Sequence, residues 1–165
     1  MSVERHPYSF LGDSRTGGSL RSGGTWHEGL IDYTGGTEAG ALRAEAGLRA
    51  LGDAAGISFR FDQKTNWQPV ESQRLLLWSG RFGKQEEFMS ALNHRHFELA
   101  QSASERQTLI NAAADVGLDV TAAAAFLDTD ELTDVVWKSY GDTIRTYGIH
   151  GKFESCISLI LTASF

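Results

Sequence analysis

The chain has 165 residues, of which 41% are hydrophobic and 22% charged, enough for one folded domain with a hydrophobic core. Its formal net charge of -6 argues against nucleic acid as a partner, because phosphate binding depends on clustered Lys and Arg. The single cysteine, Cys156, excludes an intramolecular disulfide and a cysteine-based zinc site.

No apolar run approaches the roughly 20 residues that a membrane helix needs. The polar residues 1–8 are not followed by an apolar segment of the length that a signal peptide requires. We therefore expect a cytoplasmic protein without a membrane partner.

Residues 12–40 hold nine of the chain's eighteen glycines, so we expect a glycine-rich loop or a disordered segment there. Next, residues 38–55 are rich in Ala, Leu and Glu and predict a helix that ends at Gly56. Its predicted apolar stripe consists of Leu42, Ala46, Leu48 and Leu51. Residues 57–61 alternate between apolar and polar side chains, which predicts a half-buried strand or an extended segment.

From Val70 onward the apolar spacing is helical, and it stays so to residue 147. The predicted helices cover 70–82, 85–99, a third opened by a capping box at Ser104-Glu105-Arg106-Gln107, a fourth capped by Asp119, and a last one capped near Thr129. The predicted buried stripe of the last helix is Leu132, Val135, Val136, Tyr140, Ile144 and Tyr147.

Several residues in this region invite a functional interpretation. His94 and His96 lie two apart on a helix and point about 200° apart, so they cannot share a metal ion. Asn66 and Trp67 precede Pro69 in a predicted turn with an aromatic anchor. Trp78 lies among leucines at helical spacing, and Trp137 follows two valines, so we expect both to pack in the core.

The N-terminal segment His6-Pro7-Tyr8-Ser9-Phe10-Leu11-Gly12 resembles the motif Cys-Pro-Trp-Cys-(Phe/Tyr)-(Val/Leu)-Gly of DsbA-like thioredoxin-domain proteins. Weaker matches follow in the same order along the chain: Gly56-Ile57-Ser58-Phe59, Ser72-Gln73-Arg74-Leu75-Leu76, Ala114-Asp115-Val116-Gly117-Leu118-Asp119 with Phe126-Leu127, and Tyr147-Gly148-Ile149-His150-Gly151. Together they extend over about two thirds of the chain.

The resemblance implies an α/β, thioredoxin-like fold with a large α-helical insertion at residues 70–147, in one domain covering residues 1–165. We expect a mostly helical chain with an incomplete sheet, because no second strand is evident before residue 57. Lys152 and Phe153 also stand where the family has an aliphatic residue and a cis-proline. A cis bond before Phe153 costs ~2.5 to 4 kcal/mol, so the family's loop geometry is not expected there.

The family's activity is thiol–disulfide exchange, and His6 and Ser9 occupy the two cysteine positions. A cysteine at a helix N-terminus has a lowered pKa, whereas the same helix dipole favours a neutral histidine. Serine forms no disulfide and is a weak nucleophile without a base. We therefore expect a DsbA-like protein that is redox-inactive.

Two alternatives stay open. The related 2-hydroxychromene-2-carboxylate isomerases and kappa-class glutathione transferases resemble Ser-Pro-Tyr-Ser-Tyr at this position, which implies glutathione as a possible co-substrate and no other cofactor. The second alternative is a non-catalytic binding module that uses the helical insertion, with the motif as a relic helix start. The candidate catalytic residues are His6 and Ser9, and the candidate substrate contacts are Pro7, Tyr8, Asn66 and Trp67. The implied partner is a small-molecule thiol or a protein substrate.

Overall fold

The computed structural model describes residues 5–9, 24–66 and 68–147, which form seven helices. These helices are α1 (Trp26–Tyr33), α2 (Glu38–Ala55), α3 (Val70–Gly80), α4 (Gln85–Phe97), α5 (Arg106–Asp115), α6 (Val120–Leu127) and α7 (Thr133–Tyr147). Within the described ranges there is no strand, and one antiparallel bridge joins Thr25 to Lys64. The same ranges contain no helix that is long and apolar enough to cross a membrane.

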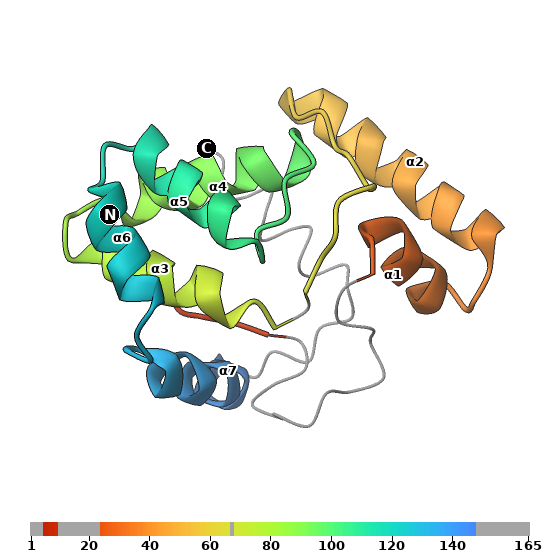
Figure 1. Cartoon of the computed structure of the whole chain (residues 1–165). Coiled ribbons are helices and arrows are strands. Elements are labelled where there is room, and N and C mark those ends of the chain that lie inside the picture. Colours follow the sequence, from red (N-terminus) through yellow and green to blue (C-terminus); the bar gives the residue numbers. More distant parts are fainter. Residues whose placement is uncertain (1–4, 10–23, 67, 148–165) are drawn as a thin grey trace.

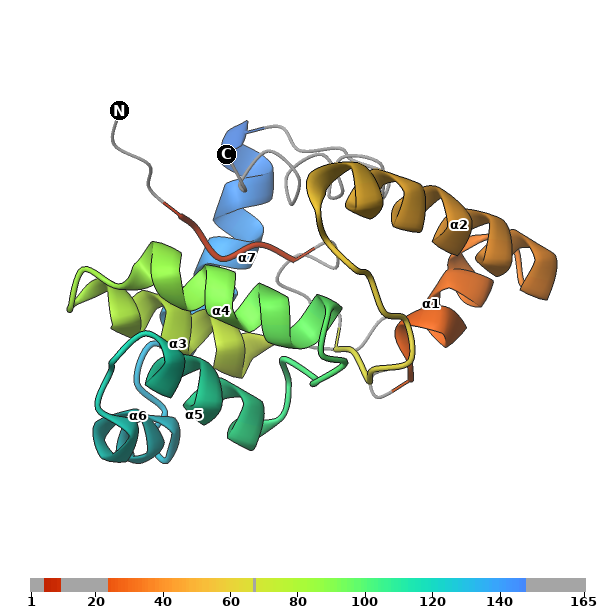
Figure 2. The same ribbon diagram turned by 90° about the horizontal axis from the view of Figure 1, so that it is seen from above.

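The helical insertion, α3 to α7, forms one packed block (Figures 1 and 2). α3 contacts α4, α6 and α7, and α5 packs between α4 and α6. The core of the block contains the buried residues Leu75, Leu76, Trp78, Phe88, Leu92, Leu109, Ala112, Ala113, Leu118, Ala123, Phe126 and Leu127. The predicted helical character of residues 70–147 is confirmed, as is the predicted cap of α6 by Asp119.

Arg74 fixes where α7 starts. Its side chain is buried on α3, where it pairs with Glu71 at 2.6 Å and lies over the ring of Phe126. Its guanidinium donates to the backbone oxygens of Glu131, at 2.7 Å, and of Thr129. These bonds hold the connection between α6 and α7 against α3. The position at which α7 starts is therefore determined by a buried cation that donates to backbone oxygens.

The N-terminal unit, residues 24–66, consists of α1, α2 and the extended segment 57–66 (Figure 2). Its small core contains Leu30, Ala41, Leu48, Phe59 and Phe61. The backbone N–H groups of Trp26 and His27 donate to the carbonyl oxygens of Gln63 and Phe61, at 3.1 and 3.0 Å. The extended form of residues 57–61 is therefore confirmed, but as a single segment without a partner strand among the described residues.

The prediction of a loop over residues 12–40 is wrong at residues 26–33 and 38–40, which are helical. A capping box at Thr25 and Glu28 starts α1, and Leu30 anchors the helix in the core. The predicted glycine flexibility is confined to the turn between α1 and α2, where Gly35 and Gly36 have φ of 85° and 77°. Residues 12–23 of the predicted loop lie outside the described residues.

The predicted apolar stripe of α2 is confirmed only at Leu48. Leu42 and Leu51 are 52% and 48% exposed and Ala46 is also exposed, and the helix buries Ala41, Glu45 and Gly52 beside Leu48. Gly52 permits this orientation, because a Cβ there would lie 2.5 Å from the ring of Phe59. The buried face of α2 thus includes a glutamate and a glycine, which the apolar spacing predicts to face solvent.

The starts of two later helices differ from prediction. α5 begins at Arg106, and its N-cap residue is Glu105, which makes no side-chain cap. Ser104 instead donates its backbone N–H to the Ser102 hydroxyl. α7 begins at Thr133, and the hydroxyl of Thr129 accepts from Glu131 within the preceding turn.

In α7 the exposure of the predicted stripe is uneven. Val136 and Tyr140 are buried as predicted, but Val135 is exposed. Trp78 is buried against Phe126, with the two rings 5.6 Å apart, and Trp137 meets Tyr140 edge-on at 5.5 Å. Core packing is therefore confirmed for Trp78, while Trp137 is half-buried.

Candidate functional site

The motif segment, residues 5–9, lies between α4 and α7 (Figure 2). At one end the guanidinium of Arg5 makes a two-pronged ion pair with Glu86 of α4. In the middle, the backbone oxygen of Pro7 accepts hydrogen bonds from Ser139 at 3.0 Å and Thr143 at 3.3 Å, both on α7. The segment is thus attached to two helices that lie more than 75 residues away in sequence.

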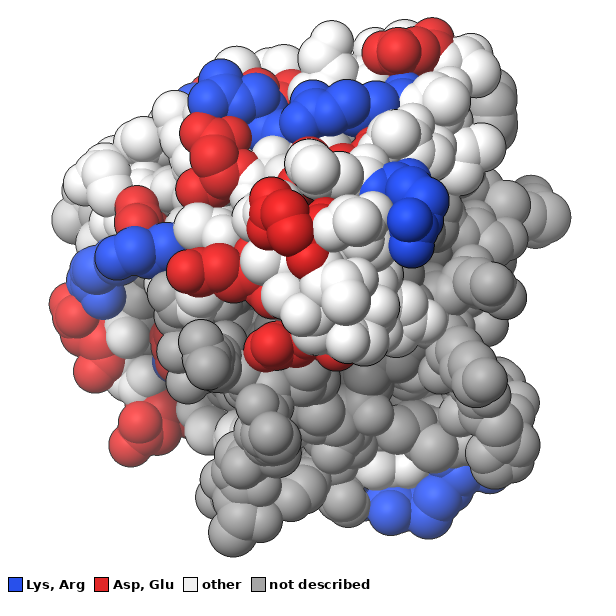
Figure 3. Space-filling view, turned by 90° about the vertical axis from the view of Figure 1, so that its right-hand side faces the viewer, with Lys and Arg blue, Asp and Glu red and all other residues white. Residues whose placement is uncertain are grey.

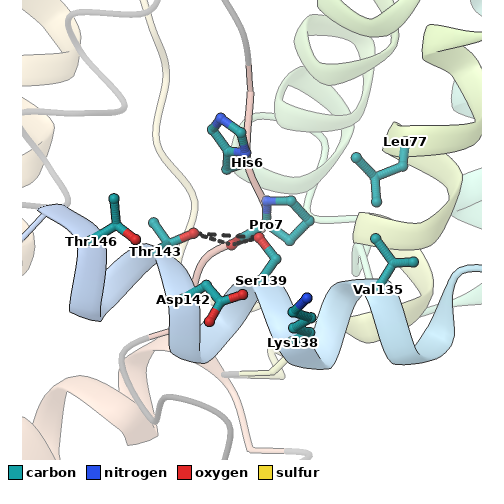
Figure 4. A pocket seen from close by; sticks show the side chains of 9 residues that line it. All are labelled: His6, Pro7, Leu77, Val135, Lys138, Ser139, Asp142, Thr143 and Thr146. Carbon is teal, nitrogen blue, oxygen red and sulfur yellow. Dashed lines mark hydrogen bonds between the residues drawn. The ribbon is translucent and has the colours of Figure 1, made fainter.

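A pocket of about 430 Å³ opens where the motif segment meets α7 (Figure 4). The motif segment contributes His6 and Pro7, and α3 contributes Leu77. One face of α7 supplies the remaining lining residues: Val135, Lys138, Ser139, Asp142, Thr143 and Thr146. These positions recur every three or four residues, the spacing that places side chains on one side of a helix.

The two ends of the pocket differ in polarity. Leu77 and Val135 form an apolar end, whereas hydroxyl groups from Ser139, Thr143 and Thr146 line the rest beside Lys138. Asp142 is paired with Arg145 at 2.9 Å, and none of the ion pairs among the described residues involves Lys138. A lysine ammonium can pair with a carboxylate or a similar small anion, whereas the hydroxyls of Ser139 and Thr143 already donate to Pro7.

Two ionisable groups near the pocket, Glu86 and Tyr140, have shifted pKa values. The hydrogen bond from Arg5 lowers the pKa of Glu86, so this carboxylate stays charged and keeps the motif segment attached to α4. On the buried side of α7, burial raises the pKa of Tyr140, whose hydroxyl has no hydrogen-bond partner among the described residues. Tyr140 therefore stays protonated and serves packing.

The predicted site residues divide into those at the pocket and those away from it. His6 and Pro7 line it, with His6 exposed and Pro7 buried. Tyr8 and Ser9 do not line it, and Ser9 is only 2% exposed. Asn66 accepts a hydrogen bond from the backbone of Gln68 at 2.9 Å in the predicted turn, away from the pocket. Trp67 lies outside the described residues.

Residues 5–9, which carry the motif, form neither helix nor strand. Residues 10–23, through which a helix that follows the motif would run, lie outside the described residues. The interpretation of this segment as a relic helix start therefore stays a prediction.

The prediction for the two histidines of α4 is confirmed. His94 Nδ1 lies 2.8 Å from Glu98 at the surface, whereas His96 is buried and its Nε2 accepts from the indole N–H of Trp26 at 2.9 Å. The two imidazoles thus face different surroundings and have separate structural roles.

Five helices packed as one block, with the motif segment against the last of them, agree with the helical insertion expected for a DsbA-like protein. A family model described as DSBA-like thioredoxin domain matches residues 3–151. The match covers most of the chain, and the chain belongs to this family. A comparison with curated proteins finds no match. The family assigns a thioredoxin-like fold, of which the described residues form a helical part.

Proposed function

We propose that this chain is a DsbA-like domain that binds a small ligand beside its motif and carries out no thiol–disulfide exchange. The observation that carries the proposal is chemical: the two positions that match the family's cysteines hold His6 and Ser9. Neither side chain can form the mixed disulfide through which exchange proceeds.

The surroundings of the motif support the same proposal. Ser9 is buried, so its hydroxyl is not presented to a substrate. Pro7 is attached to α7 through its backbone oxygen, which keeps His6 at the edge of the pocket. Cys156 is the one thiol of the chain, and a single thiol cannot close an intramolecular disulfide.

An insulin-reduction assay tests this proposal. We expect dithiothreitol to reduce insulin at the same rate with and without the wild-type chain. We also expect the chain to oxidise a dithiol peptide only at the background rate. The Cys156→Ser variant is the matched control, because it removes the remaining thiol. A wild-type rate above background that disappears in Cys156→Ser would contradict the proposal.

A second candidate function is that of a glutathione-dependent isomerase or transferase. Glutathione brings its own sulfur and two carboxylates, and the pocket offers the Lys138 ammonium as a donor to a carboxylate. His6 lies at the same pocket, where an imidazole can accept the proton of a bound thiol. These features favour a thiol-bearing carboxylate as ligand.

Calorimetric titration with glutathione distinguishes this candidate from simple absence of activity. We expect saturable binding to the wild type that weakens at least about tenfold in Lys138→Met, the range for a charge-assisted hydrogen bond. Lys84→Met is the control, because Lys84 is paired with Glu87 away from the pocket. No saturable binding would exclude glutathione. A scaffold role for the helical insertion stays a prediction. It requires that the variants His6→Ala and Ser9→Ala behave like the wild-type chain.

A further inference from the structure

His27, in the first turn of α1, lies between two carboxylates of α2. Its Nδ1 is 2.6 Å from Glu45 Oε1, and its Nε2 is 3.1 Å from Glu38 Oε2. A carboxylate only accepts hydrogen bonds, and a neutral imidazole donates from one nitrogen alone. Both contacts therefore form together only when His27 is protonated.

The charge of His27 matters because its partner Glu45 lies on the buried face of α2. The residue is 9% exposed and sits between Ala41 and Leu48. Its second oxygen lies 3.5 Å from the guanidinium of Arg49, which also donates to the backbone oxygen of Phe59 at 2.7 Å. The nearer partner of the buried charge is His27, and losing that partner's charge is costly for a buried carboxylate.

The other charged groups near His27 are engaged elsewhere. On α1, Glu28 accepts from the backbone of Thr25 at 2.8 Å. On the segment 57–66, Arg60 and Asp62 pair with each other at 2.6 Å, and Lys64 lies across the bridge from Thr25. Figure 3 shows basic and acidic side chains interspersed on the α1–α2 side of the molecule. The hydrogen bonds to Glu45 and then to Glu38 raise the pKa of His27.

A second histidine holds α1 from the other side. The indole N–H of Trp26 donates to Nε2 of His96 on α4, and the Trp26 ring lies 6.1 Å from that of Phe97. Burial lowers the pKa of His96 to about 4, so this acceptor is neutral at neutral pH. α1 thus depends on a charged histidine toward α2 and on a neutral histidine toward α4.

We propose that His27 is a pH-sensitive clasp that locks α1 against α2 when protonated and releases α1 when it loses its proton. The proposal rests on contacts within the N-terminal unit and is independent of the ligand pocket. Because the pKa of His27 is higher in the folded chain, its stabilisation is fully present below the unfolded value of about 6.5. The stabilisation is lost as the pH rises through the folded pKa.

Hydrogen exchange of the full chain, between about pH 5.5 and about pH 9 and corrected for intrinsic exchange rates, tests the clasp. We expect the protection of residues 26–33 to fall as the pH rises through the folded pKa of His27, by about tenfold for each unit by which folding raises that pKa above its ordinary value. Protection of α5, which has no contact with the clasp, should stay constant. His27→Gln should remove the pH dependence of α1.

His94→Gln is the matched control, because His94 of α4 also pairs with a glutamate, Glu98, which directly follows that helix. It should retain the wild-type pH profile of α1. Glu38→Gln provides a second test should His27→Gln not fold, since it keeps Glu45 and should reduce the fall in protection. A flat wild-type profile, or an unchanged fall in His27→Gln or Glu38→Gln, would overturn the proposal.

Discussion

The helical insertion and the N-terminal unit are stabilised in different ways. The insertion buries a cluster of twelve residues, all apolar, whereas the core of the N-terminal unit contains five. The smaller unit adds polar contacts, from His27 to Glu45 and from Trp26 to His96. Apolar packing tolerates a wide range of pH, whereas contacts through histidine do not. The comparison predicts that the N-terminal unit is the part of the molecule whose stability depends more strongly on pH.

Removing a large side chain from the insertion core should have the largest effect. Phe88 is fully buried, and Phe88→Ala should reduce the free energy of unfolding by about 3 to 5 kcal/mol, from lost burial and a residual cavity. Leu30→Ala in the smaller core should instead open mainly α1 and α2. Urea denaturation followed by circular dichroism measures the first effect, and hydrogen exchange localises the second. Equal loss of protection in both units for Leu30→Ala would show that they unfold together.

Acid should weaken the attachment of α1 to α4. The pKa of His96 is lowered from 6.5 to about 4, so the unfolded chain binds this proton more readily. The free energy of unfolding should therefore fall by about 3 kcal/mol as the pH drops from 6.5 to 4. His96→Gln, whose amide oxygen can still accept from Trp26, should show a shallower fall over the same range in urea titrations. An equally steep fall in this variant would assign the acid sensitivity to other groups.

Two glycines of α2 offer a matched pair. A Cβ at Gly52 would lie 2.5 Å from the backbone oxygen of Ile57 and from the ring of Phe59, whereas a Cβ at Gly47 meets nothing within 4 Å. Gly52→Ala should lower the midpoint of thermal unfolding, at a cost of about 1 to 3 kcal/mol. Gly47→Ala should raise it, by about 0.5 to 1 kcal/mol. Equal effects of the two variants would contradict the close packing of α2 on the segment 57–66.

The smallest expected effect comes from the cap of α1. The hydroxyl of Thr25 accepts from the backbone of Glu28 at 3.2 Å, so Thr25→Ala should cost about 1 kcal/mol in the free energy of unfolding. Ser104→Ala is the control, because Ser104 gives α5 no side-chain cap, and its effect should stay within about 0.5 kcal/mol. Chemical denaturation of both variants measures the difference in the free energy of unfolding. A larger loss for Ser104→Ala than for Thr25→Ala would contradict Thr25 as the residue that caps its helix.

Apolar spacing predicted the insertion well, because its helices bury regular stripes such as Phe88 and Leu92. It missed α1, a short helix with one fully buried apolar residue, although the Thr25 to Glu28 spacing of a capping box was present. It misplaced the buried face of α2 because Glu45 is buried there against His27, and a buried carboxylate is predictable only when its partner is known.

The candidate site was predictable only in part. His6 and Pro7 follow from the motif, but their partners on α7 are 132 residues or more away from Pro7 in the chain. A helical spacing of polar residues from Lys138 to Thr146 was the available signal for this face. That spacing also fits a solvent-exposed face, so the contact with Pro7 could come only from the tertiary structure.

Returning both sulfurs to the motif, in the variant His6→Cys/Ser9→Cys, tests most directly whether this segment can support thiol chemistry. Because the residue at position 9 is buried, we expect the variant to reduce insulin at the background rate. The pKa of the thiol introduced at position 6 is compared with that of an ordinary cysteine, about 8.5. A thiol pKa well below this value, together with turnover above background, would contradict the account.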